Sequence, residues 1–168
     1  MPQFVVNPRR TDPYKQFKFR VTWDNQVVPG IVSVSGLARR TEVVELRAGG
    51  DPSLVRHSPG RTTYEPVTLA RGVTHDKAFE DWAERVWSFD AAAGAEVKLQ
   101  SFRKDVLIDL LNEAGQLVVR YVLHAAWPSE YLPLPELDAG LAATAFERLV
   151  LQHDGWSRDR SVTEPVEP

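Results

Sequence analysis

The sequence predicts a mainly β fold, a β-sandwich or barrel with one flanking amphipathic α-helix and one long loop between strands. Three observations support this prediction. Many short segments alternate apolar and polar residues, a single segment has strong helical periodicity, and proline- and glycine-rich stretches separate them. The chain has 168 residues, of which 43% are hydrophobic, so it can bury the core of one domain. Strands in such a fold must close, be covered, or pair with another chain.

The first part of the chain reads as an arm followed by strands. Residues 1–15 hold three prolines and show no periodicity, which predicts an extended N-terminal arm before a β domain over residues 16–157. The apolar and polar pattern predicts strands over residues 17–23, 27–37, 41–46 and 62–70. A turn at residues 24–26 separates the first two strands, and Pro29-Gly30 interrupts the second.

A long loop is predicted over residues 47–61, between two of these strands. It holds three glycines and two prolines in fifteen residues, and four basic groups when His57 is counted. A loop of this length inside a compact domain usually has a function or is disordered.

One helix is predicted over residues 76–89. Asp76 can cap its start. Apolar residues recur at spacings of three and four, namely Phe79, Trp82, Ala83, Val86 and Trp87. The opposite face is mostly acidic and is either solvated or offered to a partner. A turn over residues 89–94 ends this helix, and a further strand begins near Val97 and Leu99.

The last part of the chain contains a hairpin and one ambiguous segment. Residues 106–111 and 116–123 flank Asn112-Glu113-Ala114-Gly115, which is typical of a β-hairpin. Residues 127–135 read as a proline-rich connection, and residues 158–168 as a polar C-terminal tail that we expect to be disordered. Thr144 and Glu147 favour a capped helix, whereas residues 146–153 also suit a strand.

Composition excludes several classes of function. A net charge of −3 and a pI of about 5.8 argue against a protein that binds nucleic acid over its whole surface. The absence of cysteine excludes disulfides, thiolate metal sites and cysteine nucleophiles. No apolar run approaches the roughly 20 residues that span a bilayer, so we expect no membrane insertion. Residues 1–10 lack a secretory signal pattern, and we expect no export by that route.

The charge is divided unevenly along the chain. Residues 1–75 carry 11 Lys and Arg against 6 Asp and Glu, whereas residues 76–168 carry 9 against 17. A basic N-terminal part and an acidic C-terminal part can attract copies of the chain head to tail, unless the two parts interleave in the fold.

No catalytic or metal motif is evident, and we expect neither enzyme activity nor a cofactor. His75-Asp76 is a doublet of the kind found in metal-dependent phosphohydrolases, but helix capping by Asp76 explains it better. A hydrolase using these two residues is the enzymatic alternative. Gly49-Gly50-Asp51-Pro52 precedes no helix, so a turn is favoured over a phosphate cradle.

Several stretches, taken in order, resemble the tail-tube proteins of contractile phages and of phage-tail-like injection particles. The resemblance covers residues 12–157. The stretches that carry it are Asp12-Pro13-Tyr14-Lys15-Gln16-Phe17-Lys18-Phe19-Arg20-Val21, Val34-Ser35-Gly36-Leu37, Thr41-Glu42-Val43-Val44-Glu45, Gly49-Gly50-Asp51-Pro52, Ser58-Pro59-Gly60-Arg61, Thr68-Leu69-Ala70-Arg71-Gly72-Val73-Thr74, Phe79-Glu80-Asp81-Trp82, Asn112-Glu113-Ala114-Gly115 and Gly155-Trp156.

The resemblance implies a structural role. Such proteins form hexameric rings, joined by strand-to-strand augmentation, that stack into a hollow tube inside a contractile sheath. It implies that residues 142–153 are strand. The implied partners are further copies of the chain, a sheath protein, baseplate and spike proteins, and possible cargo in the lumen. The chain would assemble in the bacterial cytoplasm and then form part of a phage tail or a released particle. An initiator ring that joins tube to baseplate or spike is the alternative role.

Contact residues follow from this expectation. The arm and the basic loop would meet neighbouring subunits or an acidic surface of the next ring. The expected contact residues are Tyr14, Lys15, Arg47, Gly49, Gly50, Asp51, Pro52, Arg56, Ser58, Pro59, Gly60 and Arg61. The exposed face of the helix would meet the sheath through Glu80, Asp81, Glu84 and Arg85.

Overall fold

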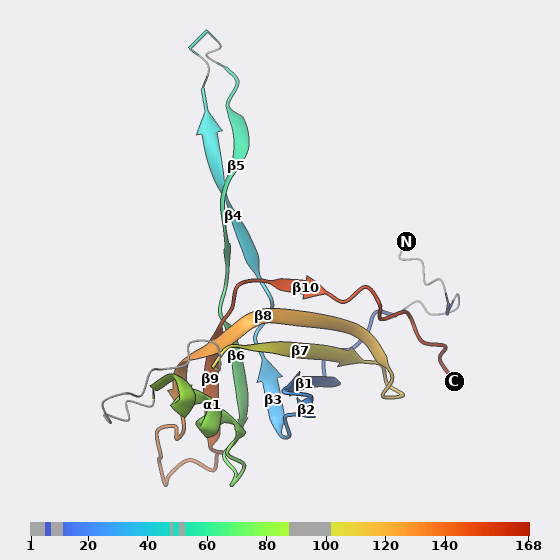
Figure 1. The fold of residues 1–168 in the computed structure, drawn as a ribbon, viewed down its shortest axis with the longest axis vertical. Helices are drawn as coiled ribbons and strands as arrows, with labels where there is room; N and C mark the ends of the chain where they lie inside the picture. Colours follow the sequence, from blue (N-terminus) through green and yellow to red (C-terminus); the bar gives the residue numbers. More distant parts are fainter. Residues whose placement is uncertain (1–5, 8–11, 48, 51–52, 88–101) are drawn as a thin grey trace.

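The computed structural model describes residues 6–7, 12–47, 49–50, 53–87 and 102–168. Over these residues the predicted mainly β fold is confirmed, with ten strands and one helix (Figure 1). The elements in chain order are β1 (Phe19–Trp23), β2 (Gln26–Val27), β3 (Ile31–Val34), β4 (Arg39–Leu46), β5 (Arg56–Tyr64), β6 (Val67–Gly72), α1 (Ala78–Trp87), β7 (Lys104–Leu111), β8 (Leu117–Leu132), β9 (Phe146–Gln152) and β10 (Trp156–Arg158).

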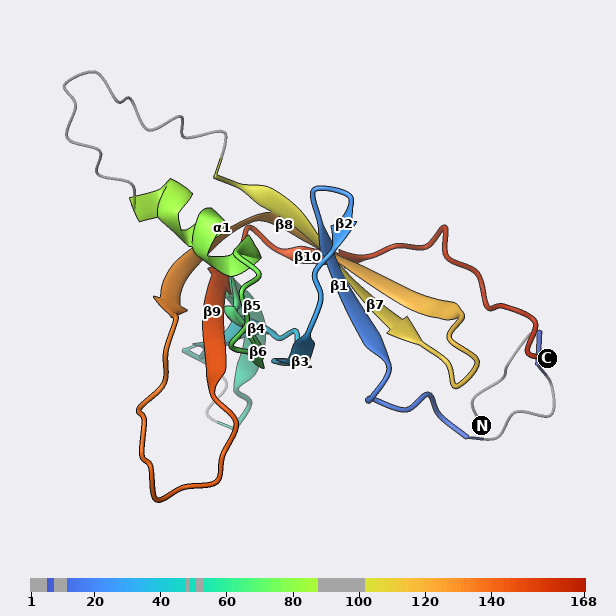
Figure 2. The same cartoon turned by 90° about the horizontal axis from the view of Figure 1, so that it is seen from below.

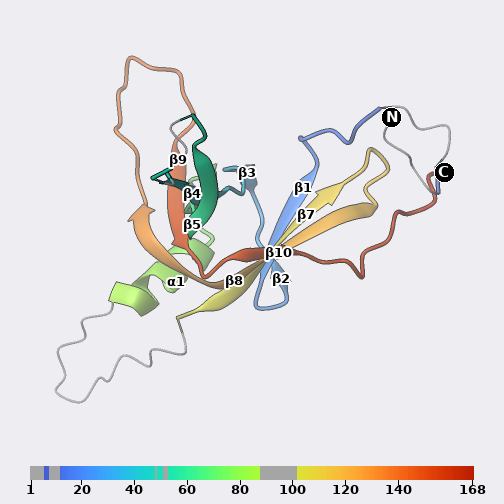
Figure 3. The same ribbon diagram turned by 90° about the horizontal axis from the view of Figure 1, so that it is seen from above.

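The strands form one antiparallel path with a separate two-stranded hairpin. The order in the path is β2-β1-β7-β8-β9-β6-β3, with β10 beside β8, and β4 pairs with β5 alone. Figures 2 and 3 show two groups of strands that diverge from β8. We call β2, β1, β7, β10 and the start of β8 the first blade, and the end of β8, β9, β6 and β3 the second blade.

Strand β8 joins the blades because it changes partner along its length. Its residues up to Ala126 pair with β7, and those from Trp127 pair with β9. Ala125 has a φ of 51° at this change, and the register with β9 shifts between Pro128 and Glu130. Such irregularities bend a strand. The expected closed barrel is not seen in the described residues, since β2 and β3 end the path without pairing with each other.

The core lies between the two blades and under α1. The first blade contributes Val21 and Leu123, and the second contributes Leu69 and Leu149, all buried. From α1 the buried side chains are Phe79, Trp82 and Ala83. The indole nitrogen of Trp82 donates a hydrogen bond of 2.6 Å to the carbonyl oxygen of Phe102. The helix is therefore held on the body by the apolar face that its periodicity predicted.

The predicted start of the helix is confirmed by its cap. The Asp76 carboxylate accepts a hydrogen bond of 2.9 Å from the backbone N–H of Ala78, the first residue of α1. The predicted end of the helix at residues 89–94 and the strand start at Val97 and Leu99 lie outside the described residues.

The predicted hairpin after the helix is also confirmed. Strands β7 and β8 are joined by a turn in which Gly115 has a φ of 82° and donates its N–H to the carbonyl oxygen of Asn112. The Asn112 side chain closes the turn by accepting the N–H of Gln116 at 2.8 Å. Glycine takes this φ without strain, which is why a glycine at the end of residues 112–115 predicts a tight turn.

Two predicted irregular segments were wrong in extent. The loop predicted over residues 47–61 is partly strand, because β5 begins at Arg56. The connection predicted over residues 127–135 is also strand as far as Leu132. In both cases a proline lies beside a shift of register. In the β4–β5 ladder the register shifts between Thr41 and Val43, and Val43 pairs with Pro59. In β8 the register shifts directly after Pro128. A bulge tolerates proline without ending the strand.

Two predicted strands are each divided in two. Residues 27–37 contain the end of β2 and all of β3, separated around Gly30, whose φ is 76°. Residues 62–70 contain the end of β5 and most of β6, separated at Glu65-Pro66. Glycine with positive φ and proline without an N–H both interrupt a ladder.

The ambiguous segment is a strand, as the resemblance implied, but it covers residues 146–152 rather than the whole of 142–153. Strand β9 pairs with β6 along its length, and its residues Glu147, Leu149 and Leu151 are buried in alternation. Glu147 is therefore an inward-facing strand residue rather than part of a helix cap.

The C-terminal tail differs from the expectation of disorder. Residues 156–158 form β10 beside β8 (Figure 1), and the segment that follows is hydrogen-bonded to Asn7. The Asn7 side chain donates to the Glu164 carboxylate at 2.8 Å and accepts the N–H of Glu167 at 3.1 Å. These hydrogen bonds give the polar tail a defined path.

Candidate assembly surfaces

The most prominent candidate surface is the β4–β5 hairpin, residues 39–64, which projects from the body along the longest axis (Figure 1). All eight residues of β4 are exposed, and in β5 only Ser58 and Tyr64 are half-buried. A two-stranded hairpin without a covering layer is marginally stable in water. The uncovered hairpin is therefore a candidate contact surface.

Large apolar side chains on the hairpin face solvent. They are Val43 (64% exposed), Val44 (41%), Leu46 (56%) and Leu54 (58%). Clustered exposed apolar side chains mark interaction surfaces, whereas single ones are ordinary.

The hairpin continues the second blade outward, since β4 follows β3 and β5 leads into β6, which pairs with β3. At its base Tyr64 packs edge-on against Trp156, with ring centroids 6.2 Å apart, and against His153 at 5.9 Å. The His153 ring also hydrogen-bonds the carbonyl oxygen of Glu65 at 2.9 Å. These contacts fix the direction in which the hairpin projects.

A bulge sets the shape of the hairpin between Thr41 and Val43. A Cβ atom on Gly60 would lie 3.0 Å from Cγ2 of Val44 and 3.2 Å from the carbonyl oxygen of Glu42. Glycine at this position therefore allows the two strands to approach closely.

Most of the sequence-predicted contact residues lie on this hairpin. Arg47, Gly49 and Gly50 belong to its connecting segment, and Arg56, Ser58, Pro59, Gly60 and Arg61 belong to β5. Asp51 and Pro52 lie outside the described residues.

The remaining two predicted contact residues lie elsewhere, in the segment before β1. Lys15 forms an ion pair of 3.3 Å with Glu113 in the β7–β8 turn, and Tyr14 precedes it in the chain. The predicted residues thus occupy two separate surfaces.

The outer face of α1 is a third candidate surface. Glu80, Asp81, Glu84 and Arg85 are exposed on the side opposite the buried Phe79. The face carries three acidic groups and one basic group, as the periodicity predicted.

A groove between the blades is a fourth candidate surface. It has a volume of about 540 Å³ and lies between β1, β7 and β3. Phe17 and Val32 line it and are 61% and 53% exposed. None of its lining residues is charged.

Sequence reasoning missed a buried charge network at the base of α1. Arg71 is 1% exposed and donates to the Asp76 carboxylate at 2.7 Å and to a Glu147 carboxylate oxygen. Tyr131 donates its hydroxyl to Glu147 at 3.0 Å. Burial disfavours the Arg71 cation, but hydrogen bonds from its side chain to Asp76 and Glu147 outweigh burial and raise its pKa. The only sequence signal is that Arg71 continues the inward alternation of Val67 and Leu69.

Tyr131 lies in the same buried environment and donates its hydroxyl to the same carboxylate, that of Glu147. Burial, followed by the hydrogen bond to Glu147, raises the pKa of Tyr131 to about 12. The hydroxyl therefore stays protonated and remains a donor at neutral pH.

A second buried carboxylate crosslinks the first blade. Asp109 in β7 is fully buried and accepts hydrogen bonds from Arg20 of β1 at 3.0 Å and from Arg120 of β8 at 2.6 Å. The three residues are direct partners in the ladder. Burial alone would raise the pKa of Asp109, but the hydrogen bonds from Arg120 and Arg20 outweigh it and hold the pKa below its ordinary value.

A metal-binding cluster and a membrane-spanning helix are both absent from the described residues. No three His, Asp or Glu in this part of the chain gather where they could bind a metal ion, and no helix in it is long and apolar enough to cross a bilayer. The Asp76 carboxylate of the His75-Asp76 doublet is engaged by Arg71 and by the helix start. The capping interpretation is confirmed by this geometry.

One family of known proteins matches most of the chain. The family model described as T4-like virus tail tube protein gp19 matches residues 15–157. No curated protein matches the chain significantly in sequence.

Solved structures of injection particles contain similar chains. A chain in the tube-terminating cap of the anti-feeding prophage has 27% identity and a TM-score of 0.71, covering 89% of this chain and 93% of that chain. A chain in the PVC sheath–tube complex in the extended state has 25% identity and a TM-score of 0.71, with the same coverage. A chain in the sixfold-symmetrised anti-feeding prophage baseplate has 22% identity and a TM-score of 0.73, covering 89% and 97%, and shares the fold.

Proposed function

Since the chain belongs to the family of T4-like virus tail tube protein gp19 and is a tail tube protein of contractile injection systems, we propose that its copies form hexameric rings that stack into a hollow conduit. The observation that carries this proposal is the β4–β5 hairpin, which projects uncovered and exposes apolar side chains. A contact between two unlike surfaces of identical copies either closes into a ring or grows as a filament. A stacked tube needs both outcomes, because contacts within a layer close into a ring and contacts between layers continue as a filament.

Pairing between sheet edges would join subunits within a ring. Strand β3 pairs only with β6 in the described part of the chain and ends the path, so its outer edge is open to a strand of another copy. Edge pairing gives affinity through backbone hydrogen bonds. The uncharged groove beside β3, with the exposed Phe17 and Val32, supplies apolar surface for the same contact.

The hairpin would make contacts between rings or with a neighbouring subunit. Over residues 39–64 it holds five arginines against three acidic residues, whereas the whole chain has a net charge of −3. A basic projection that meets an acidic surface reduces the repulsion between stacked rings. Tyr14 and Lys15 would add contacts from the arm, and Asp51 and Pro52 would join the other predicted residues at the hairpin contact.

The outer face of α1 would face the sheath. The comparison structures include a sheath–tube complex, and the acidic face of α1 is exposed on this subunit. We expect baseplate and spike proteins as further partners, cargo in the lumen, assembly in the bacterial cytoplasm, and then a place in a phage tail or released particle.

Deletion of residues 50–59 tests the proposed role of the hairpin. The exposed hairpin contributes little to the core, so the variant should fold, with an unfolding transition close to that of the parent chain, but should not elongate into tubes under the electron microscope. Tubes of normal length and yield would contradict this role. A parent chain that forms only isolated hexamers would instead indicate the initiator ring.

Charge reversal tests the sheath-facing surface. Replacing Glu80, Asp81 and Glu84 by lysine should abolish co-sedimentation of tubes with purified sheath protein while tubes still form, because these side chains lie outside the core. The matched control reverses Glu130 and Asp154, which are exposed and lie outside both α1 and the hairpin. Sheath binding that survives the helix reversal would remove α1 from this interface.

A further inference from the structure

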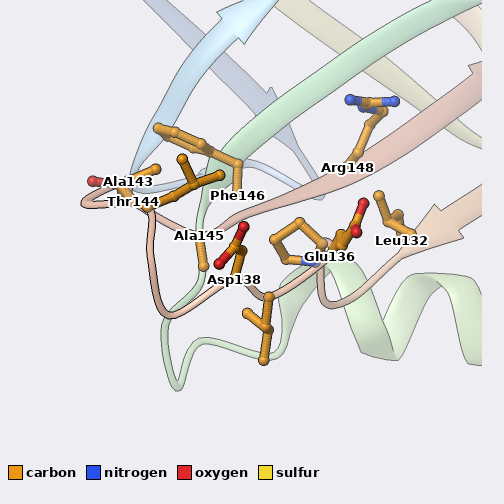
Figure 4. Close-up of a pocket in the computed structure, with 11 residues that line it drawn as sticks. Leu132, Glu136, Asp138, Ala143, Thr144, Ala145, Phe146 and Arg148 are labelled. Carbon is orange, nitrogen blue, oxygen red and sulfur yellow. The ribbon is translucent and has the colours of Figure 1, made fainter.

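A further exposed apolar surface lies on the connection between β8 and β9. Residues 133–145 form this connection, and eight of them, together with Leu132, Phe146 and Arg148, line a pocket of about 280 Å³ (Figure 4). We call it the β8–β9 pocket. Its size suits a few side chains rather than a whole strand.

The connection exposes large apolar side chains around and in this pocket. Leu137 and Leu141 are each 67% exposed, Leu134 is 51% exposed, and Phe146 is 42% exposed. The hairpin exposes four further large apolar side chains. Contiguous exposed apolar residues of this kind mark interaction surfaces.

The charges on the two surfaces are complementary. Glu136 and Asp138 line the β8–β9 pocket against a single Arg148, which leaves the lining net negative. On the hairpin, Arg47 follows Leu46 and Arg56 lies close to Leu54 in the chain, so basic groups accompany the apolar ones. Unlike charges beside matching apolar groups select both partner and register.

The two surfaces lie at opposite ends of the molecule. In Figure 1 the hairpin points to one end of the longest axis, and the β8–β9 connection lies at the other end. One copy cannot bring them together, whereas two copies displaced along this axis can. A contact between unlike patches at opposite ends repeats without limit, as stacking requires.

We propose that the β8–β9 pocket receives the tip of the β4–β5 hairpin from another copy of the chain. This inference rests on the proposed function, because it names the surface that each hairpin reaches in the stack. The groove between β1, β7 and β3 is the competing acceptor, but its lining holds no charged residue to match Arg47 and Arg56.

Engineered disulfides test the contact directly, since the chain contains no cysteine of its own. Leu54→Cys is combined in turn with Leu134→Cys, Leu137→Cys or Leu141→Cys, all at exposed positions that leave the core intact. A disulfide requires Cα atoms within about 7 Å, so it reports direct contact. Assembled full-length chains are oxidised, and non-reducing electrophoresis is combined with electron microscopy. At least one combination should shift from monomer to a ladder of covalent multimers.

The matched control combines Leu54→Cys with Val32→Cys, which lies in the groove and is exposed to a similar degree. Tubes that form while no pocket combination crosslinks, or while only the Val32→Cys control does, overturn the pocket assignment and leave the tube intact. Absence of tubes from the parent chain and from every variant, together with absence of crosslinks in every variant, overturns the proposed function itself. The two failures are therefore distinguishable.

Discussion

Arg71 and Asp109 are nearly or fully buried, although a charged side chain is usually exposed. Each is compensated by opposite charges on neighbouring elements, Arg71 by Asp76 and Glu147, and Asp109 by Arg20 and Arg120. Removing one member of such a group leaves a buried or half-buried opposite charge without compensation, which destabilises more than the group itself stabilises. These two residues should therefore dominate the effects of single substitutions at charged positions.

Replacing Arg71 by alanine should lower the free energy of unfolding by about 3–5 kcal/mol, because Glu147 would remain buried without its cation. Denaturant unfolding measures the change. Arg40→Ala is the matched control, since Arg40 pairs with Glu65 at 2.6 Å but is 78% exposed. That control should change the free energy by about 0–1 kcal/mol. Equal effects at the two positions would show that the Arg71 network is not buried as described.

The lowered pKa of Asp109 predicts acid sensitivity with a defined sign. A carboxyl whose pKa is lower in the folded state stabilises the fold above its ordinary pKa of 3.8 and loses that contribution as the pH falls toward the folded value. Asp109→Asn should therefore be less stable than the parent chain at neutral pH, and the two free energies of unfolding should converge below pH 3.8. Parallel curves across this range would contradict the coupling between Asp109 and its two arginines.

At the scale of elements, the strands and helix that bury a face were predictable because burial imposes a period on the sequence. Strand β1, helix α1 and the β7–β8 turn follow from such periods or from turn residues. The extent of β5 was not predictable, because its residues are exposed and include Pro59 and Gly60. The ladder in that hairpin is set by its bulge and by the anchoring of Tyr64, neither of which leaves a periodic pattern.

The hairpin should be sensitive to a single methyl group at Gly60. Gly60→Ala places a Cβ atom 3.0 Å from Val44, so the strands must shift, and tube yield should fall while the unfolding transition of the body is retained. Gly49→Ala is the matched control, because a Cβ atom there meets no atom within 4 Å. Electron microscopy of both variants gives the comparison. Normal tubes from Gly60→Ala would mean that the shape of the hairpin is unimportant for assembly.

At the scale of the whole molecule, the ordered motifs predicted the family, whereas the positions of the candidate surfaces needed the structure. Chain order does not place the hairpin and the β8–β9 connection at opposite ends, because that depends on how the two blades diverge from β8. The division into a basic N-terminal part and an acidic C-terminal part hinted at head-to-tail contact. The structure places exposed arginines on the hairpin and exposed carboxylates on α1 and the β8–β9 connection.

We propose that identical copies join their sheet edges into a closed ring of six. Native mass spectrometry of the purified full-length chain, at rising concentration and after seeding with baseplate components, measures this assembly. A closed ring of six gives a species six times the mass of the 18.9 kDa chain, together with larger multiples of that species. Monomers alone under every one of these conditions would contradict it.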